Sequence, residues 1–189
     1  MLETRTVSLK TAIAIIVVCT AAFITLGISV GYAKYWDLDE NAHLDSGRTY
    51  YRQGNKDRAQ AEYKKALSLD KNNIEAMYNL GLVEKDMKNY KDAEFHLQGV
   101  LKINPSNELA SYTLAQVYRE SKQYNKASMQ YLKALKLSPG SANIIAELGL
   151  VYEAQGKEAE AIDQYRDALS FVPDLEIARE GISRLGRQG

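Results

Sequence analysis

The sequence predicts an all-α protein: an N-terminal transmembrane helix, then an α-solenoid of four helix–turn–helix repeats, then a C-terminal capping helix. Three observations lead to this prediction. The N-terminal part contains a long uncharged stretch, the prolines recur at a fixed spacing, and small and large apolar residues return at the same positions of each repeat. A fixed period in this range is the usual sign of a repeat architecture.

The N-terminal segment predicts a membrane span. Between Lys10 and Lys34 lie 23 residues without a charged side chain. As an α-helix they would extend about 34 Å, enough to cross a hydrocarbon core of about 30 Å. Aromatic residues, which favour the headgroup region, cluster at the far end: Tyr32, Tyr35 and Trp36. We therefore expect a short tail over residues 1–10 and a transmembrane helix over 11–36.

Two other interpretations of this segment were weighed. Gly31-Tyr32-Ala33 offers small residues for signal-peptide cleavage, but the apolar stretch is longer than the roughly 7–15 residues of such signals. A lipoprotein signal resembles a small residue followed by Cys, whereas Val18 precedes Cys19. An uncleaved span is the preferred prediction. Gly27 and Gly31 form a GxxxG pair for packing of another transmembrane helix, unless they only reflect the frequency of Gly in such helices.

Basic residues around the span predict its orientation. Arg5 and Lys10 precede it, and Lys34 follows it. Because basic residues favour the cytoplasmic side, we expect the short tail in the cytoplasm and the repeats on the other side. In a bacterium this is a single-pass inner-membrane protein with periplasmic repeats.

The repeat period is 34 residues. The only prolines are Pro105, Pro139 and Pro173, and both gaps are 34 residues. Counting back from them gives four rows, whose positions we number as columns 1 to 34: 40–73, 74–107, 108–141 and 142–175.

The columns agree in size and polarity. Small residues occupy column 8 (Gly47, Gly81, Ala115, Gly149) and column 20 (Ala59, Ala93, Ala127, Ala161). Large residues occupy column 24 (Tyr63, Leu97, Tyr131, Tyr165) and column 28 (Leu67, Leu101, Leu135, Leu169). Apolar spacing of three and four residues predicts two amphipathic helices in each row. The small residues let these helices cross closely, and the large ones fill the space between them.

These rows resemble the tetratricopeptide-repeat (TPR) family. Its 34-residue pattern has a large–small pair at columns 7 and 8, matched by Leu80-Gly81, Leu114-Ala115 and Leu148-Gly149. Tyr50, Tyr118 and Tyr152 match its aromatic column 11. The resemblance covers residues 40–175 and implies a right-handed superhelix with a concave, protein-binding groove.

Departures from the pattern have structural meaning. The first row has Ser46 in place of the usual Leu and Lys71 in place of proline, which suits a terminal repeat. Glu84 stands in the aromatic column, and we expect it to loosen the contact between the helices of its row. Residues 176–185 continue as a partial row with a charged face, which predicts a capping helix.

The resemblance implies that columns 2, 5, 6, 9, 12 and 13 face the groove. The candidate partner-binding residues are Leu44, Arg48, Arg52, Tyr78, Asn79, Leu82, Leu109, Tyr112, Gln116, Arg119 and Leu150. Their apolar and aromatic character favours an apolar or amphipathic segment of a protein partner, although the tyrosines could instead pack along their own helices. One TPR subfamily binds acidic C-terminal tails of chaperones through a two-carboxylate clamp, with Lys in column 5 and Asn in column 9 of its first row. This chain has Leu44 and Arg48 at those positions, so such a clamp is not expected.

Composition excludes several function classes. Lys and Arg number 24 and Asp and Glu number 24, so the net charge is zero, which argues against a nucleic-acid partner. One Cys cannot form an intramolecular disulfide, and His43 and His96 lie in different rows, so no metal site is expected. No catalytic or phosphate-binding motif occurs. We expect no enzyme activity, no cofactor and no small-molecule substrate.

Together these features predict a membrane-anchored interaction scaffold. Only Asp37-Leu38-Asp39 separate the span from the first row, so the repeats lie close to the bilayer. The chain resembles anchored TPR subunits that serve cytochrome c maturation, periplasmic chaperoning and photosystem assembly. We expect a role in assembling a membrane or secretory-pathway complex, with a membrane-proximal protein partner and the bilayer itself contacted through residues 11–36. The alternative is a permanent structural subunit of a larger integral membrane complex.

Overall fold

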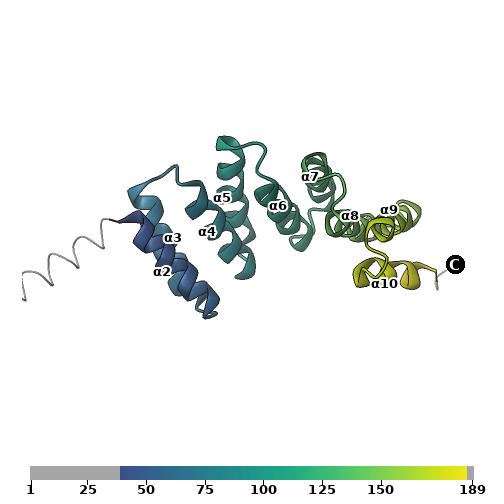
Figure 1. Cartoon of the computed structure of the whole chain (residues 1–189), viewed down its shortest axis with the longest axis horizontal. Coiled ribbons are helices and arrows are strands. Elements are labelled where there is room, and N and C mark those ends of the chain that lie inside the picture. The colour runs from purple at the N-terminus through teal and green to yellow at the C-terminus, as the bar shows by residue number, and fades with distance from the viewer. Residues whose placement is uncertain (1–38, 187–189) are drawn as a thin grey trace, which may run out of the picture.

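Helix pairs build the part of the protein that the computed structural model describes, residues 39–186 (Figure 1). Within these residues the secondary structure consists of nine helices and no strands. Their bounds are α2 Glu40–Arg52, α3 Lys56–Leu69, α4 Ile74–Asp86, α5 Tyr90–Ile103, α6 Glu108–Glu120, α7 Tyr124–Leu137, α8 Ala142–Ala154, α9 Glu158–Phe171 and α10 Glu176–Leu185.

The helices stack in chain order. Each first helix (α2, α4, α6, α8) packs against the second helix of its row, which in turn packs against the next row, and α10 covers the last pair. Successive pairs are rotated relative to one another along the stack (Figure 1). The all-helical solenoid is thus confirmed, whereas its right-handed sense stays a prediction. No helix in residues 39–186 has the length and hydropathy needed to cross a bilayer. The predicted span at 11–36, with Gly27 and Gly31, lies outside the described residues.

The turn between the two helices of a row has the same backbone conformation each time. Column 15 holds Gly54, Lys88, Lys122 and Gly156, with φ between 62° and 77°. This left-handed region suits glycine, and a residue with a Cβ atom is strained there. Gly54, Asn89 and Gly156 indicate this turn in three rows of the sequence. The row with Ser121-Lys122-Gln123 has neither Gly nor Asn at these positions.

Asparagine side chains begin several of the helices. Asn73 and Asn107 accept hydrogen bonds from the backbone N–H groups of Ala76 (2.8 Å) and Ala110 (2.9 Å). These bonds satisfy amides that lack a partner within the helix. Since Asn107 follows Pro105 by two residues, the proline and the cap together end α5 and start α6.

Column 24 packs directly on column 8, as the sequence predicts. The column 24 side chains are at most 1 % exposed. A Cβ atom added at Gly47 or Gly149 would lie 2.5 or 2.6 Å from the ring of Tyr63 or Tyr165. These are closer than any ordinary carbon contact, so glycine is what allows the tyrosine ring to enter the helix crossing.

Glu84 departs from the expected role. It is 1 % exposed, and its carboxylate lies 2.7 Å from His96 Nδ1 and accepts a hydrogen bond from Gln60 Nε2 at 3.3 Å. The same His96 nitrogen lies 3.0 Å from the carbonyl oxygen of Asp92, so a protonated Nδ1 satisfies both acceptors. The expected loosening is not observed, because Glu84 joins α3, α4 and α5 through polar contacts. His96 likewise has a partner, and its side chain is only 17 % exposed.

The capping helix α10 lies unusually close to the last row. Its buried residues are Ala178, Gly181 and Leu185. A Cβ atom at Gly181 would lie 2.3 Å from the ring of Tyr165, on the side opposite to the one that Gly149 meets. Tyr165 is therefore enclosed between two glycines, one from α8 and one from α10.

Candidate protein-binding surface

The predicted groove residues lie on the first helices, but they are not equally accessible. Arg52 and Leu109 are exposed, and these are half-buried: Arg48, Tyr78, Asn79, Leu82, Tyr112, Gln116, Arg119 and Leu150. Leu44 is 3 % exposed and packs in the core with Tyr63 and Leu80, so its assignment to the groove surface is corrected. Column 5 lies at the seam between successive first helices, and Ala146 in the same column is also buried.

Polar contacts join the first helices at the N-terminal side of the stack. Arg48 of α2 pairs with Glu75 of α4. The hydroxyl of Tyr51 donates a hydrogen bond to Asp86 at 2.6 Å, and burial together with this bond raises the pKa of Tyr51. These contacts fix the relative position of α2 and α4. Glu75 and Asp86 were not among the expected site residues, although columns 2 and 13 contain them.

The same arrangement continues to the C-terminal side. Lys85 of α4 donates to Gln116 of α6 at 3.2 Å. Arg119 of α6 lies 2.9 Å from the carboxylate of Glu147 on α8, which also accepts a hydrogen bond from the Tyr131 hydroxyl at 3.0 Å. Burial and the nearby Glu147 raise the pKa of Tyr131. Arg48, Gln116 and Arg119 are thus occupied in joining helices.

The last contact of this series joins the capping helix α10 to α8, the first helix of the fourth row. Arg184 of α10 donates two hydrogen bonds to Glu153 of α8, at 2.6 and 2.8 Å, and Tyr165 donates one at 2.8 Å. The Arg184 guanidinium beside Glu153 lowers the pKa of that carboxyl despite its partial burial. Every neighbouring pair of first helices from α2 to α10 is therefore bridged by side chains.

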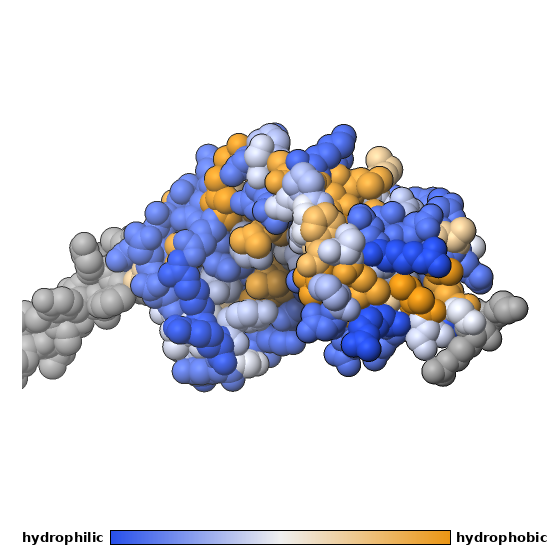
Figure 2. Space-filling model, turned by 45° about the vertical axis from the view of Figure 1, so that its right-hand side comes forward, coloured by the Kyte–Doolittle hydropathy of each residue, from blue (hydrophilic) through white to orange (hydrophobic). Residues whose placement is uncertain are grey.

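Apolar side chains remain accessible between these bridges. Leu109 at the start of α6 is 61 % exposed. Tyr112 is half-buried, with its ring centroid 6.1 Å from that of Tyr131, and Leu82 and Leu150 are half-buried on α4 and α8. Figure 2 shows hydrophobic patches lying between hydrophilic residues on one face of the molecule, around a hollow near its middle. An apolar surface with fixed polar groups is suited to a protein segment.

A second apolar depression was not expected from the sequence. It has a volume of about 560 Å³ and lies between the first two rows, lined by Leu67, Met77, Phe95 and Gly99 among others. Phe95 is 72 % exposed. Gly99 opens the depression, because a Cβ atom there would lie 2.8 Å from the Met77 sulfur. Its column 26 carries Lys65, Lys133 and Asp167 in the other rows, a contrast that could have indicated the depression.

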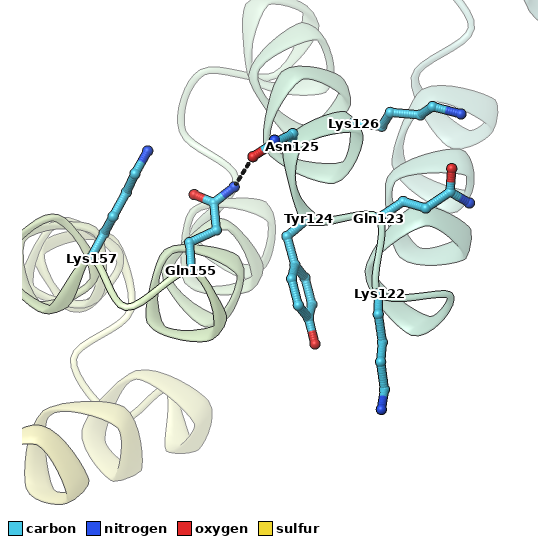
Figure 3. A pocket seen from close by; sticks show the side chains of 7 residues that line it. All are labelled: Lys122, Gln123, Tyr124, Asn125, Lys126, Gln155 and Lys157. Carbon is cyan, nitrogen blue, oxygen red and sulfur yellow. Dashed lines mark hydrogen bonds between the residues drawn. The ribbon is translucent and has the colours of Figure 1, made fainter.

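The depression between the turns of the third and fourth rows is polar. It has a volume of about 480 Å³, and its lining includes Lys122, Lys126 and Lys157. The three lysines point in different directions (Figure 3), and a hydrogen bond of 2.9 Å joins Gln155 to Asn125. The lysines do not converge on one point, so this depression has no arrangement for gripping a single anion.

The histidines are used inside the repeats. His43 lies 2.6 Å from Glu62, joining α2 to α3, as His96 and Glu84 join α5 to α4. Residues 39–186 contain no group of three or more His, Cys, Asp or Glu side chains placed to hold a metal ion.

Comparison with known proteins agrees with this architecture. Residues 37–172 match the family model described as the cilia and flagella-associated protein 70 middle TPR-like domain. None of the curated proteins matches the chain. A crystal structure of MamA protein is similar at 26 % identity, with a TM-score of 0.73, covering 78 % of this chain and 81 % of that chain.

Two further solved structures share the fold. MamA 41-end from Desulfovibrio magneticus RS-1 is 21 % identical with a TM-score of 0.68, covering 78 % of this chain and 93 % of that chain. A chain of the APC/C hetero-tetramer Cut9–Hcn1 is 22 % identical with a TM-score of 0.70, covering 77 % of this chain and 30 % of that chain. The TPR fold typically provides a non-enzymatic scaffold for protein partners. With its family model covering residues 37–172, the chain belongs to this TPR-like repeat family.

Proposed function

We propose that this chain is a membrane-anchored scaffold that holds an apolar or amphipathic segment of a partner protein along its first helices. The partner is a component of a membrane or secretory-pathway complex during its assembly or maturation. The proposal combines the protein-binding fold with two features of the sequence, the predicted span at 11–36 and the three-residue link after it. An assembly factor held at the membrane meets co-embedded partners at a raised effective concentration.

One observation supports this binding surface above the others. Leu109 is 61 % exposed on α6, next to helices whose relative positions are fixed by the bridges from Lys85 to Gln116 and from Arg119 to Glu147. A prearranged surface loses little conformational entropy on binding. The half-buried Tyr112 and Leu82 extend the apolar area on α6 and α4. Such spacing suits a segment with apolar residues on one side.

Photo-crosslinking in the native membrane tests the surface, because Leu109 has a matched control. Met129 is also 61 % exposed, but lies on α7, the second helix of the same row. A photoreactive residue is introduced at Leu109 or at Met129 in the full-length chain, and the adducts are identified by mass spectrometry. We expect a discrete membrane-protein adduct from Leu109 and not from Met129. Equal adduct patterns at both positions would contradict the proposal.

A charge substitution tests the same surface without a label. Leu109→Glu places a charge in the apolar contact, and we expect partner recovery in mild detergent to fall by roughly tenfold or more, as for a residue central to an interface. Met129→Glu keeps partner recovery unchanged. If both variants lose partner binding while their helical content is unchanged, the binding surface is not specific to α6, which contradicts the proposal.

The amount and state of the partner distinguish assembly factor from permanent subunit. Recovery of immature partner at less than one copy per chain supports the assembly role. A mature companion at equal stoichiometry supports the structural-subunit alternative. A topology reporter fused after Gly189 tests the proposed inner-membrane orientation, and activity of the reporter in the periplasm is the expected result.

A further inference from the structure

We propose that the edge of the solenoid where the first helices begin contacts the headgroup region of an anionic lipid bilayer, through the apolar depression between the first two rows. This inference rests on the membrane anchoring proposed above. It adds a second contact with the bilayer, made by the repeats themselves on the side of the second helices, whereas the partner-binding surface lies on the first helices.

The position of the depression is the first argument. First helices begin, and second helices end, at one edge of the solenoid, which we call the start edge. Leu67 lies in the last turn of α3, Lys71 follows that helix, and Met77 lies in the first turn of α4. Phe95 and Gly99 lie within α5, so the depression extends from the middle of α5 to this edge. In Figure 1 the beginning of α2 lies beside the loop from α3 to α4.

The length of the link after the predicted span brings this edge to the membrane. The span is predicted to end at Trp36, and α2 begins at Glu40. Asp37, Leu38 and Asp39 reach at most about 10 Å even when fully extended. The beginning of α2 therefore lies in or next to the headgroup region, and the end of α3 lies alongside it, since His43 and Glu62 hold the two helices together at 2.6 Å.

The exposed apolar residues distinguish the two edges. Column 30 ends each second helix at the start edge, and its residues are all large and exposed: Leu69 40 %, Ile103 45 %, Leu137 39 % and Phe171 52 %. Among the described residues, none of the exposed large hydrophobic side chains belongs to the turns at the opposite edge, over 53–57, 87–91, 121–126 and 155–159. An apolar row on one edge is suited to the boundary between headgroups and acyl chains.

Two lysines at the rim of the depression favour an anionic lipid at this place on the edge. Lys71 and Lys102 stand at the rim of the depression, and neither ammonium group makes an ion pair or side-chain hydrogen bond with another residue of the described range. Phe95, which is 72 % exposed, and Met77 provide the apolar part next to them. Free ammonium groups above an apolar floor match a lipid phosphate above its glycerol and upper acyl chain.

Depth-dependent quenching in vesicles tests the contact in the full-length chain. Cys19 is replaced by Ser, and a fluorophore is attached through Gln98→Cys in the lining of the depression, Ile103→Cys at the start edge, or Asn55→Cys at the opposite edge. The vesicles contain phosphatidylcholine with or without phosphatidylglycerol, plus a lipid carrying a quencher near its headgroup. We expect strong quenching at positions 98 and 103 when phosphatidylglycerol is present, and none at position 55.

Charge reversal tests the lysines. Each lysine beside an anionic surface contributes roughly a fivefold preference, so loss of both positive charges alone lowers the ratio of docked to undocked molecules by about 25-fold. Lys71→Glu with Lys102→Glu also adds two negative charges, so we expect a decrease larger than that. Lys88→Glu with Lys122→Glu at the opposite edge is the matched control and leaves quenching unchanged. Quenching that ignores both lysine pairs and the lipid charge would overturn the assignment to an anionic lipid.

Flotation of the vesicles separates this inference from the anchoring proposal. Protein that floats with the vesicles and resists carbonate extraction, yet shows no more quenching at positions 98 and 103 than at 55, overturns the lipid contact and leaves the anchoring intact. Protein that does not float overturns the anchoring and this inference together. If the fluorophores at positions 98 and 103 are protected from a water-soluble quencher but are not quenched by the lipid, a bound protein covers the start edge in place of lipid. That result also contradicts the proposal.

Discussion

The second and third rows have the same helix geometry but fill it with different chemistry. In the third row, Tyr118 and Tyr131 occupy columns 11 and 24, and their hydroxyls donate to Glu94 at 2.9 Å and Glu147 at 3.0 Å. In the second row, Glu84 and Leu97 occupy those columns. A buried carboxylate with His96 as its partner thus takes the place of a buried aromatic ring.

This difference shows what a repeat position requires. Columns 8, 20 and 24 fix the distance between helices by side-chain volume, and they vary little in size among the four rows. In the second and third rows, column 11 holds a buried group whose polar atoms are satisfied. Tyr118 achieves this with one hydroxyl, and Glu84 achieves it with two contacts, to His96 and Gln60. A buried polar group without such partners would be costly.

Removing the buried carboxylate is expected to have the largest effect. Glu84→Ala leaves a cavity and takes the partner from His96 and Gln60, so the free energy of unfolding should fall by about 2–3 kcal/mol. Urea unfolding of the full-length chain in mild detergent, followed by circular dichroism, measures this loss. Glu158→Ala, at an exposed position on α9, is the control and should change it by under about 0.5 kcal/mol. An equally small effect of Glu84→Ala would show that the second row does not depend on this contact.

Removing a hydroxyl from the third row should cost less. Tyr131→Phe keeps the ring but leaves Glu147 without one donor, and we expect the free energy of unfolding to fall by about 1 kcal/mol at pH 7. Tyr124→Phe, on the same helix, is the comparison variant with almost no effect, because its hydroxyl makes no side-chain hydrogen bond with the described residues. A loss of 2 kcal/mol or more would mean that the hydroxyl also supports the pair of Arg119 with Glu147.

The pH dependence of the same variant sharpens the comparison. Burial raises the pKa of Tyr131 above its ordinary value of 10.0. The unfolded chain therefore releases this proton at a lower pH than the folded chain, and the stability that the hydroxyl contributes is complete below pH 10 and is lost as the pH rises further. We expect the difference between the wild type and Tyr131→Phe to shrink above pH 10. A constant difference across this range would contradict the burial of the hydroxyl.

The smallest effect should come from a position that the two rows share. Lys88 and Lys122 have φ values of 63° and 62°, where glycine is favoured. Lys122→Gly should raise the free energy of unfolding by about 0.5–1 kcal/mol, because it relieves this strain. Lys133→Gly, within α7, should lower it by about 1 kcal/mol and shows that the gain is specific to the turn. A destabilising Lys122→Gly would mean that the lysine side chain holds the turn.

Much of the architecture could be predicted because it depends on single side chains. The spacing of Pro105, Pro139 and Pro173 fixes the rows, and the small residues of column 8 predict where the column 24 rings lie. Contacts between columns were harder to predict. Only the structure shows that column 5 lies at the seam between first helices, which places Leu44 in the core.

Pairing of polar groups was the other part that the sequence did not disclose. His96 stands in column 23 of the one row that has a carboxylate in column 11, a coincidence that points to their contact once both are known to face each other. The bridges from Arg48 to Glu75 and from Tyr51 to Asp86 join residues of different rows. Such pairs depend on how one row is rotated onto the next, which no single row encodes.

The packing of Tyr165 between Gly149 and Gly181 distinguishes the end of the solenoid from its internal repeats. In the earlier rows, column 6 of the following helix carries a side chain, Asn79, Thr113 or Glu147, whereas α10 has Gly181 there. The last helix consequently rests on the ring itself and is not interchangeable with an ordinary first helix. Gly181 thus lets α10 approach the Tyr165 ring more closely than a helix with a side chain in column 6 could. A whole repeat inserted at an internal junction, such as after Pro105 or Pro139, should leave the contact between Tyr165 and α10 intact, whereas one inserted after Pro173 should remove it.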